Sequence, residues 1–507
     1  MNRCAGSLVA LFLVSLAAAT AAAQSKAPRV EQARALTNSA SSALTVVPQQ
    51  LFGALPVSTR STEARQLVEK AFEEYENVML VESLASARKA TRKDPKFALA
   101  YAMWSFAARR DVPAAAALAK ANALAVSAPP EERLLVHWMT ATQSRDLLPA
   151  IQSMNDLLAK FPKDKHVLYL TAEWLYFQQD YEKSRQLFEA AAKIDPNFPP
   201  AQNMLGYAYI ETGDPDPAKA VAALQRYSEL LPTQPNPHDS LGEVYRYAGN
   251  DEGSLEEYAA ALKLSPTFYT SQLGLGDTSA MMGDYERART EFAKAIPLAA
   301  SSRDKLHIAF QKALINFWAG KPEQGRRELA ALAQQAAQQK DPYAQYEIGL
   351  GRAFLASSTD EEIKALDALQ AKFSKPVTGM SANDRQTALA SMLRERVRVL
   401  SLAGKTGDAS RSIHQLEALA TATRDSIVGD CYYSAKGYAL FASGDYSGAI
   451  SLLQSDTQNP LVAHQIVLSY EKLGDSANAT LAKTRFRYLR APTPQWYLAS
   501  QTGAASN

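Results

Sequence analysis

Apolar side chains recur along this chain in one short sequence motif that occurs several times. The clearest copies are GDYERARTEFAKAI from Gly283, QDYEKSRQLFEAAA from Gln179, GNDEGSLEEYAAAL from Gly249 and GDYSGAISLL from Gly444. Their apolar residues share one helical face, spaced three to four positions apart. The pattern therefore predicts a chain of repeated amphipathic helices.

Prolines that follow a helical segment give the length of the repeat. They are Pro95, Pro129, Pro162, Pro196, Pro232 and Pro266, separated by 34, 33, 34, 36 and 34 residues. A period near 34 residues is typical of helix–turn–helix repeats. The longer interval contains GDPDP at 213–217, where two residues are inserted at a turn.

Twelve residues before each of these prolines, the side chain is always small. These positions are Ser83, Ala117, Ala150, Ser184, Ala220 and Ser254, with Ala288 next in phase. Such regularity predicts close approach of two helix backbones, because a larger side chain would overpack the contact. One turn further on are Phe188, Leu224, Tyr258 and Phe292, which we expect to fill the core.

Glycines mark the end of the first helix of each pair. Leu-Gly pairs at 205–206, 241–242 and 275–276 are each followed, seven residues after the glycine, by Gly213, Gly249 and Gly283. We expect this second glycine to adopt the left-handed conformation that closes a helix without a Cβ penalty. The proline then ends the second helix because it lacks an N–H.

The combination of Leu-Gly-x-x-Tyr, Gly-Asp-Tyr, a small residue, a large aromatic residue and a terminal proline resembles the tetratricopeptide repeat (TPR) family. The resemblance is clearest over residues 165–300 and stays in phase over 61–300. It implies an all-α, right-handed superhelical solenoid of antiparallel helix pairs, in which the first helix of each pair lines a concave groove. The layout also resembles uncharacterised exported bacterial proteins of this repeat type, which adds no activity.

The two ends of the chain depart from the repeat. Residues 1–23 have the pattern of a secretory signal peptide, with Arg3 before an apolar run and Ala21-Ala22-Ala23 as the cleavage site. Residues 24–60 are rich in Ser, Ala, Thr, Gln and Pro, which predicts a flexible leader. Turn glycines at 320, 404, 444 and 474 are spaced 84, 40 and 30, so residues 301–490 are expected to form degenerate helical repeats and 491–507 a ragged tail.

Composition and charge narrow the function. Lys and Arg total 54 against 52 Asp and Glu, a balance that gives no global field to attract nucleic acid or an anionic membrane. The signal peptide predicts an exported protein, periplasmic or secreted, and no later stretch is apolar enough to span a membrane. Cys4 precedes the apolar run, the wrong place for a lipid-modified cysteine. Cys431 is expected to be a buried small hydrophobe.

No constellation for catalysis stands out. The histidines, His137, His166, His238, His307, His414 and His464, are scattered without metal-ligand spacing. The glycines of LGLGD at 273–277 are interpreted as packing positions, and the basic KTRFRYLR from Lys483 as the polar side of a capping helix rather than a contact for an anionic surface. We therefore predict no enzyme, metal or cofactor.

The candidate site is the inner face of the repeats, where helical phase groups aromatic and acidic residues. These residues are Tyr169, Glu173, Tyr176 and Phe177, then Asn203, Tyr207 and Glu211, then Asp239, Glu243, Arg246 and Tyr247. Aromatic faces attract cations or proline rings, and carboxylates select basic groups. The alternative interpretation is that the tyrosines cover the inner helix layer and the acids form a solvated face.

These observations predict an exported, non-catalytic scaffold or adaptor that binds a protein or an extended peptide in its groove. Some members of the family clamp a C-terminal carboxylate with Lys and Asn, but the corresponding positions here carry Tyr, Glu, Asp and Ser, so that ligand is not expected. The alternative is a glycan- or small-solute-binding helical-repeat receptor of the cell envelope. The missing lipid-anchor cysteine counts against this alternative, and glycan array screening would separate the two.

Overall fold

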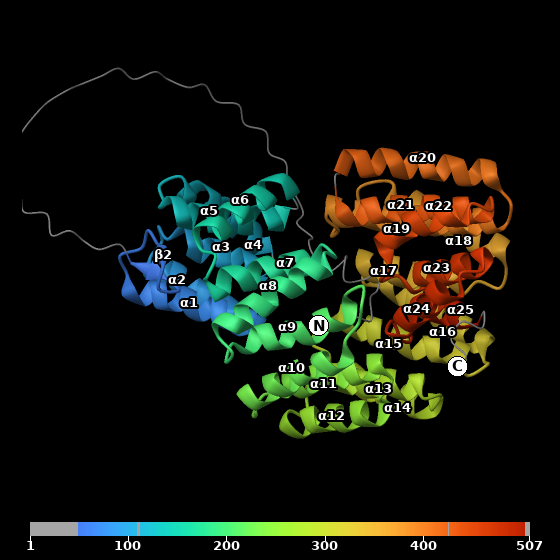
Figure 1. Ribbon diagram of the computed structural model, residues 1–507, viewed down its shortest axis with the longest axis horizontal. Coiled ribbons are helices and arrows are strands. Elements are labelled where there is room, and N and C mark those ends of the chain that lie inside the picture. Colours follow the sequence, from blue (N-terminus) through green and yellow to red (C-terminus); the bar gives the residue numbers. More distant parts are fainter. Residues whose placement is uncertain (1–48, 109–111, 145, 424, 502–507) are drawn as a thin grey trace, which may run out of the picture. The chain divides into compact units, whose positions relative to one another are not determined.

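A computed structural model describes residues 49–108, 112–144, 146–423 and 425–501 (Figure 1). The predicted signal peptide and most of the predicted leader therefore lie outside the described residues. The architecture is the expected all-α, right-handed solenoid of antiparallel helix pairs. It divides into two compact units between Thr142 and Gln143.

The N-terminal unit begins with a short hairpin. Its elements are β1 (Gln50–Leu51), β2 (Leu55–Pro56), α1 (Thr62–Glu76), α2 (Leu80–Lys93), α3 (Ala98–Ala108), α4 (Val112–Ala125) and α5 (Pro130–Ser144). Leu51 and Leu55 are fully buried, and the chain after the hairpin is held by the buried Glu132, whose carboxylate accepts from the Ser58 and Leu99 N–H groups. The expected flexible leader is therefore wrong for residues 49–60, because alternating apolar residues anchor them to the helices.

The C-terminal unit holds the clearest repeats and continues well beyond them. Its first helices are α6 (Leu147–Lys160), α7 (Lys165–Phe177), α8 (Tyr181–Ile194), α9 (Pro199–Glu211), α10 (Pro217–Leu230), α11 (Pro235–Ala248), α12 (Asp251–Leu264), α13 (Tyr269–Met281) and α14 (Tyr285–Leu298). They are followed by α15 (Ser302–Trp318), α16 (Pro322–Gln338), α17 (Pro342–Phe354), α18 (Thr359–Phe373), α19 (Ala382–Leu402), α20 (Thr406–Thr423), α21 (Ser426–Ala442), α22 (Tyr446–Leu453), η2 (Gln454–Asp456), α23 (Pro460–Leu473), α24 (Ser476–Arg487) and α25 (Pro494–Ser500).

The small positions pack as the sequence predicts. All seven are buried, and their exposed fractions lie between 0 and 2%. The Ser83 hydroxyl donates to the Ala71 carbonyl at 2.7 Å, and the Ser184 hydroxyl donates to Ala172 at the same distance. Each bond joins the second helix of a pair to the backbone of the first, so the two backbones approach closely at the small residue.

The large residues fill the space that the glycines leave. Phe188, Leu224 and Phe292 are fully buried and Tyr258 is 3% exposed. A Cβ added at Gly276 would lie 2.6 Å from the Phe292 ring, and one at Gly274 would lie 2.2 Å from the Tyr258 ring. The interpretation of the LGLGD glycines as packing positions is therefore confirmed.

The helix-ending glycines are confirmed with one exception. Gly249 and Gly283 have φ of 82°, and Gly320, Gly404, Gly444 and Gly474 also have positive φ. Gly213 does not: α9 ends at Glu211 and the following residue, Thr212, has extended backbone, because the two inserted residues of GDPDP lengthen the turn. The left-handed conformation predicted for Gly213 is therefore wrong.

Longer helices explain why the period loosens after residue 300. Helices α15, α16 and α21 have 17 residues each, α20 has 18 and α19 has 21, against 13 or 14 in α7–α14. The segment expected to be a ragged tail instead forms α25, with Trp496 buried and stacked on Phe486 at 4.5 Å between ring centroids. Two aromatic residues thus anchor the end of the described chain.

Candidate functional site

The inner layer of the C-terminal unit is made by the first helices of successive pairs. Helix α7 contacts α9, α9 contacts α11, and α11 contacts α13. The outer helix α8 buries only Ser184, Phe188 and Ala191, whereas α9 buries residues around almost its whole circumference. The inner helices are therefore covered on two sides, and the outer helices on one.

All eleven predicted site residues lie on α7, α9 and α11, as helical phase requires. Most are buried: Tyr169, Asp239, Glu243, Arg246 and Tyr247 are 1–2% exposed, Asn203 and Tyr207 are 4–5%, and Glu173 and Glu211 are 6%. Only Tyr176 and Phe177 are half-buried. A groove in which these aromatic rings contact a ligand requires accessible rings, but Tyr169, Tyr207 and Tyr247 are buried because neighbouring helices pack on them.

The packing of Tyr169 shows the reason. Its ring centroid lies 5.5 Å from that of Phe188 on the outer helix α8 and 5.7 Å from that of Phe198 at the start of α9. Tyr169 thus joins one pair to the next. Tyr176 at the end of α7 lies against Phe177 and Tyr181, and these rings form the more accessible aromatic edge.

Glu243 is the centre of a buried polar cluster in α9 and α11. Its carboxylate accepts the Tyr247 hydroxyl at 2.6 Å and the Tyr207 hydroxyl at 3.1 Å, and the Arg246 guanidinium lies 3.5 Å away. Burial and the Glu243 charge raise the pKa of Tyr207. The two tyrosine hydroxyls therefore hold the Glu243 carboxylate in place from two sides.

The polar layer continues from the predicted Asp239 to residues of α13, α15 and α17 that sequence reasoning did not select. Asp239 accepts the Ser271 hydroxyl of α13 at 2.6 Å, and burial raises the pKa of this carboxyl to about 6. On α15, His307 forms an ion pair with Glu347 of α17 at 2.6 Å. The clue was present in the sequence, because His307 and Gln311 occupy the same helical face one turn apart.

C-terminal elements contact the carboxyl ends of three successive inner helices. The Ser426 hydroxyl donates to the Gln178 side chain after α7 at 2.9 Å, and the Gln458 amide donates to the Glu211 carbonyl at 3.3 Å. Arg490 reaches α11, where its guanidinium donates to the Arg246 carbonyl at 3.3 Å. Ser426, Gln458 and Arg490 are spaced 32 residues apart, so the later segments contact successive inner helices at regular intervals along the chain.

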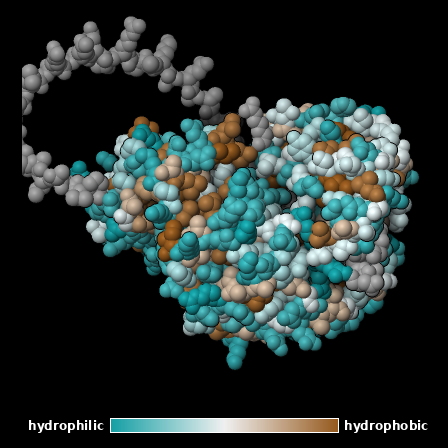
Figure 2. All heavy atoms as spheres, in the orientation of Figure 1, coloured by the Kyte–Doolittle hydropathy of each residue, from teal (hydrophilic) through white to brown (hydrophobic). Residues whose placement is uncertain are grey.

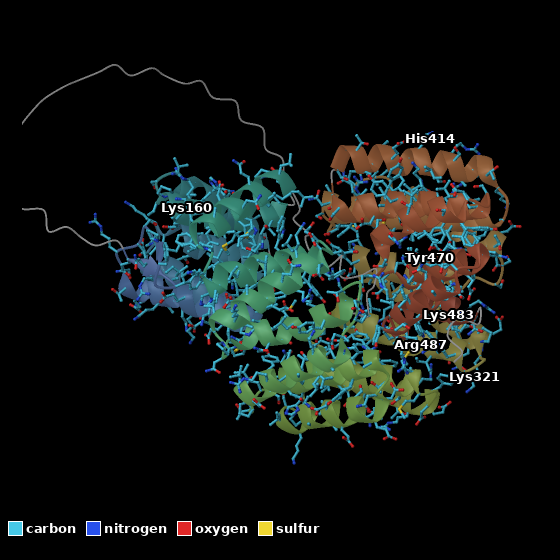
Figure 3. All side chains as sticks on the ribbon, viewed as in Figure 1. Lys160, Lys321, His414, Tyr470, Lys483 and Arg487 are labelled. Carbon is cyan, nitrogen blue, oxygen red and sulfur yellow. The ribbon has the colours of Figure 1, made fainter. Side chains whose placement is uncertain are left out.

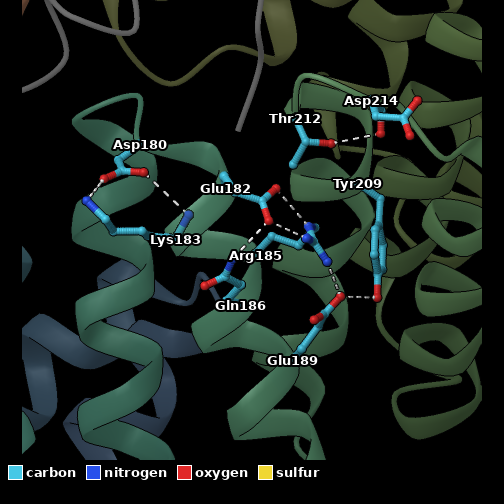
Figure 4. A network of polar contacts seen from close by, with 9 residues as sticks. All are labelled: Asp180, Glu182, Lys183, Arg185, Gln186, Glu189, Tyr209, Thr212 and Asp214. Atoms are coloured by element: carbon cyan, nitrogen blue, oxygen red, sulfur yellow. Dashed lines mark hydrogen bonds and ion pairs between the residues drawn. The ribbon is translucent and has the colours of Figure 1, made fainter.

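The motif tyrosine Tyr209 has a different role from the inner tyrosines. Its hydroxyl donates to Glu189 at 2.9 Å, and Glu189 also accepts Arg185 at 2.6 Å (Figure 4). Arg185 in turn pairs with Glu182. This partly exposed network joins α8 to α9, so Tyr209 sets the spacing of two pairs.

A second buried cluster lies in the later repeats. Arg394 of α19 forms an ion pair with Asp456 at 2.6 Å, and its guanidinium lies 3.7 Å from the Cys431 sulfur. Cys431 is 1% exposed, and burial raises the pKa of its thiol to about 12. The interpretation of Cys431 as a buried residue is confirmed, and its thiolate is strongly disfavoured.

Asp430, beside this cluster, provides a pH-dependent prediction. Burial and the nearby Asp456 and Asp425 raise the pKa of its carboxyl to about 8 from the ordinary 3.8, although Arg394 opposes this shift. The folded chain therefore keeps a proton that the unfolded chain loses, and the stability that this proton provides is lost as the pH rises from about 4 to 8. Asp430→Asn should remove this loss, so its melting temperature should rise relative to that of the wild type between pH 5 and 8.

Melting curves across that range test the expectation. Asp360→Asn is the matched control, because the Asp360 side chain is 86% exposed and pairs only at the surface with Lys405. Its melting temperature should follow that of the wild type in parallel. A parallel curve for Asp430→Asn would contradict the prediction.

Across the described ranges, no group of three or more His, Cys, Asp and Glu residues is placed to hold a metal ion. None of the helices formed by these residues is both long and apolar enough to cross a bilayer. On the face drawn in Figure 2, apolar areas are interrupted by hydrophilic ones.

Comparisons with known proteins agree with this architecture. One tetratricopeptide repeat model matches residues 175–238, and a second matches residues 143–199 and 240–303. The UDP-N-acetylglucosamine–peptide N-acetylglucosaminyltransferase of Giardia intestinalis is 25% identical over 141 residues, which are 27% of this chain. The chain spans only 9% of that relative's length.

Several solved structures are also similar. PilW, a type IV pilus biogenesis factor, is 19% identical and matches 39% of this chain and 89% of its own, with a TM-score of 0.33. A tetratricopeptide repeat protein from Parabacteroides merdae is 17% identical and matches 54% of this chain and 93% of its own, with a TM-score of 0.34.

The stacked helix pairs define the class: this is a helical-repeat solenoid protein. Residues 143–303 carry tetratricopeptide repeats, as the matched models and the packed small and large positions show. Proteins built from these repeats are interaction scaffolds that bind protein partners.

Proposed function

We propose that this chain is an exported, non-catalytic scaffold that binds a protein or an extended peptide along the inner helices α7, α9 and α11. The observation that carries the proposal is the continuous inner face, on which the cluster around Glu243 lies beside the aromatic edge formed by Tyr176 and Phe177. Export is inferred from the signal-peptide pattern of residues 1–23.

Polar groups on this face are held in place before any partner arrives. Tyr207 and Tyr247 fix the Glu243 carboxylate, and Ser271 fixes Asp239. A scaffold with preset acceptors loses less conformational entropy on binding than a flexible one. The aromatic edge adds contact area that costs few rotamers.

Site-specific photo-crosslinking in the native cell envelope tests this proposal. A photoreactive phenylalanine analogue at Phe177 should crosslink to a partner, because this ring is half-buried on the inner edge. The same analogue at Lys183, which is 71% exposed on the outer helix α8, is the matched control and should not. Equal crosslinking at both positions, or none at Phe177, would contradict the inner-face assignment.

A separate measurement tests whether the chain is exported. N-terminal sequencing of the chain recovered from the periplasm or the medium should begin at or near Gln24. Recovery of the chain with Met1 intact from the cytoplasm would overturn this part of the proposal.

A further inference from the structure

The inner face of α11 already holds a basic segment of this same chain. The KTRFRYLR segment, residues 483–490, runs from α24 toward α25. Figure 3 shows its Lys483 and Arg487 on α24. Tyr488 packs against the cluster that contains Tyr207 and Tyr247, and Arg490 lies at the carboxyl end of α11. The segment interpreted as a polar cap therefore makes specific contacts.

Arg490 occupies a shaped position. Its guanidinium forms an ion pair with Asp251 at 3.0 Å and also donates to the Arg246 carbonyl. Arg246, which is 1% exposed, returns a bond to the Arg490 carbonyl at 2.6 Å. Gly249 leaves room for the guanidinium, since a Cβ there would lie 3.3 Å from it.

The electrostatics of this position favour a cation. The carboxyl end of a helix carries a partial negative charge, and Arg490 lies against the last turn of α11. Asp251 adds a full negative charge at the start of α12. Arginine, with donors in a planar fork, can serve a carboxylate and a carbonyl at the same time.

The rest of the inner layer is also rich in acceptors. Asp239 and Glu243 on α11 and Glu347 on α17 are carboxylates. The amide oxygens of Asn203 on α9 and Gln311 on α15 are buried and have no hydrogen-bond partner among the described residues. A ligand that satisfies these groups must bring hydrogen-bond donors, and a cationic guanidinium provides several of them beside the carboxylates.

We propose that the partner of the inner face is an extended basic segment with arginine next to an aromatic residue, and that it competes with Tyr488 and Arg490 for the end of α11. The proposal rests on the scaffold function above and specifies its partner. Residues 483–490 of this chain, which combine arginines with aromatic residues, show the kind of segment that fits the end of α11. Around α11 the contacts of this segment are both polar, through Arg490, and aromatic, through Tyr488.

A binding experiment with synthetic peptides tests this inference on the full chain. The probe is fluorescent KTRFRYLR, and its matched control is KTRFRYLA, which lacks only the terminal arginine. The Arg490→Ala variant should bind the probe at least about tenfold more tightly than the wild type does. It should also bind the probe at least about tenfold more tightly than it binds the control peptide, because a charged hydrogen bond has an effect of this size. Binding should also weaken as salt is added.

A second substitution identifies the position. In the Arg490→Ala background, Asp251→Asn should reduce probe binding to the level of the control peptide, whereas Glu252→Gln should leave it unchanged, because Glu252 is exposed beside it. Arg490→Gln preserves most of the side-chain volume and replaces Arg490→Ala if the latter does not fold. Equal binding of probe and control, or insensitivity to Asp251→Asn, would overturn the proposal.

This result is separable from the scaffold proposal. If Phe177 crosslinks to a partner and the basic probe does not bind, the scaffold function stands and the partner chemistry proposed here is wrong. If crosslinking at Phe177 is absent as well, the inner-face function itself fails.

Discussion

Replacing Arg394 by methionine is expected to lower the free energy of unfolding by about 3–5 kcal/mol, because it leaves a buried carboxylate without its counter-ion. Arg394 and Asp456 are each 5% exposed and lie 2.6 Å apart. Burial already raises the pKa of Asp456, and Arg394 opposes this shift. Chemical denaturation followed by circular dichroism measures the loss.

The paired substitution separates a stranded charge from lost packing. Arg394→Met with Asp456→Asn removes both charges, so it should recover much of the stability that Arg394→Met alone loses. Arg411→Met is the surface control, because that side chain is 73% exposed, and it should change stability by less than about 0.5 kcal/mol. A small effect of Arg394→Met alone would show that the ion pair is not important for stability.

Replacing Phe292 by alanine should cost about 3–5 kcal/mol, since it removes a fully buried ring from between two helices. Met282→Ala, at a side chain that is 48% exposed, is the control and should have little effect. The same denaturation experiment measures both changes. A loss below about 1 kcal/mol for Phe292→Ala would contradict its assignment to the core.

The glycine opposite this ring makes the test specific. Gly276→Ala should destabilise the wild type, because the added Cβ would lie 2.6 Å from the Phe292 ring. In the Phe292→Ala background the clash is gone, and Gly276→Ala should stabilise by up to about 1 kcal/mol through helix propensity. The sign of the Gly276→Ala effect should therefore reverse between the two backgrounds, and two effects of the same sign would contradict the packing.

Much of the repeat could be predicted because its causes are local in the sequence. The small position at Ser184, the large one at Phe188 and the proline at Pro196 all act within one helix pair. The same holds for Gly249, whose left-handed backbone depends only on the turn that it closes. The prediction of a left-handed backbone at Gly213 was wrong for an equally local reason, since the turn that contains this glycine is two residues longer.

The site was predicted only in part. Helical phase correctly grouped Tyr207 with Glu211, and Glu243 with Tyr247, because a helix fixes which side chains share a face. It did not predict their burial, since exposure depends on what packs against that face. That packing comes from adjacent helix pairs, as when Phe188 and Phe198 cover Tyr169, and from segments far along the chain, such as the turn that carries Gln458.

The sequence by itself thus determined the helix pairs, their period, and the residues at which two backbones meet, since these follow from spacing along a helix. Only the tertiary structure decided that residues 49–60 pack, that α25 exists, and that Arg490 reaches α11 across 244 residues. The physical reason is that small changes in the geometry of each repeat accumulate along a solenoid. Residues far apart in the chain meet only once this summed curvature is known.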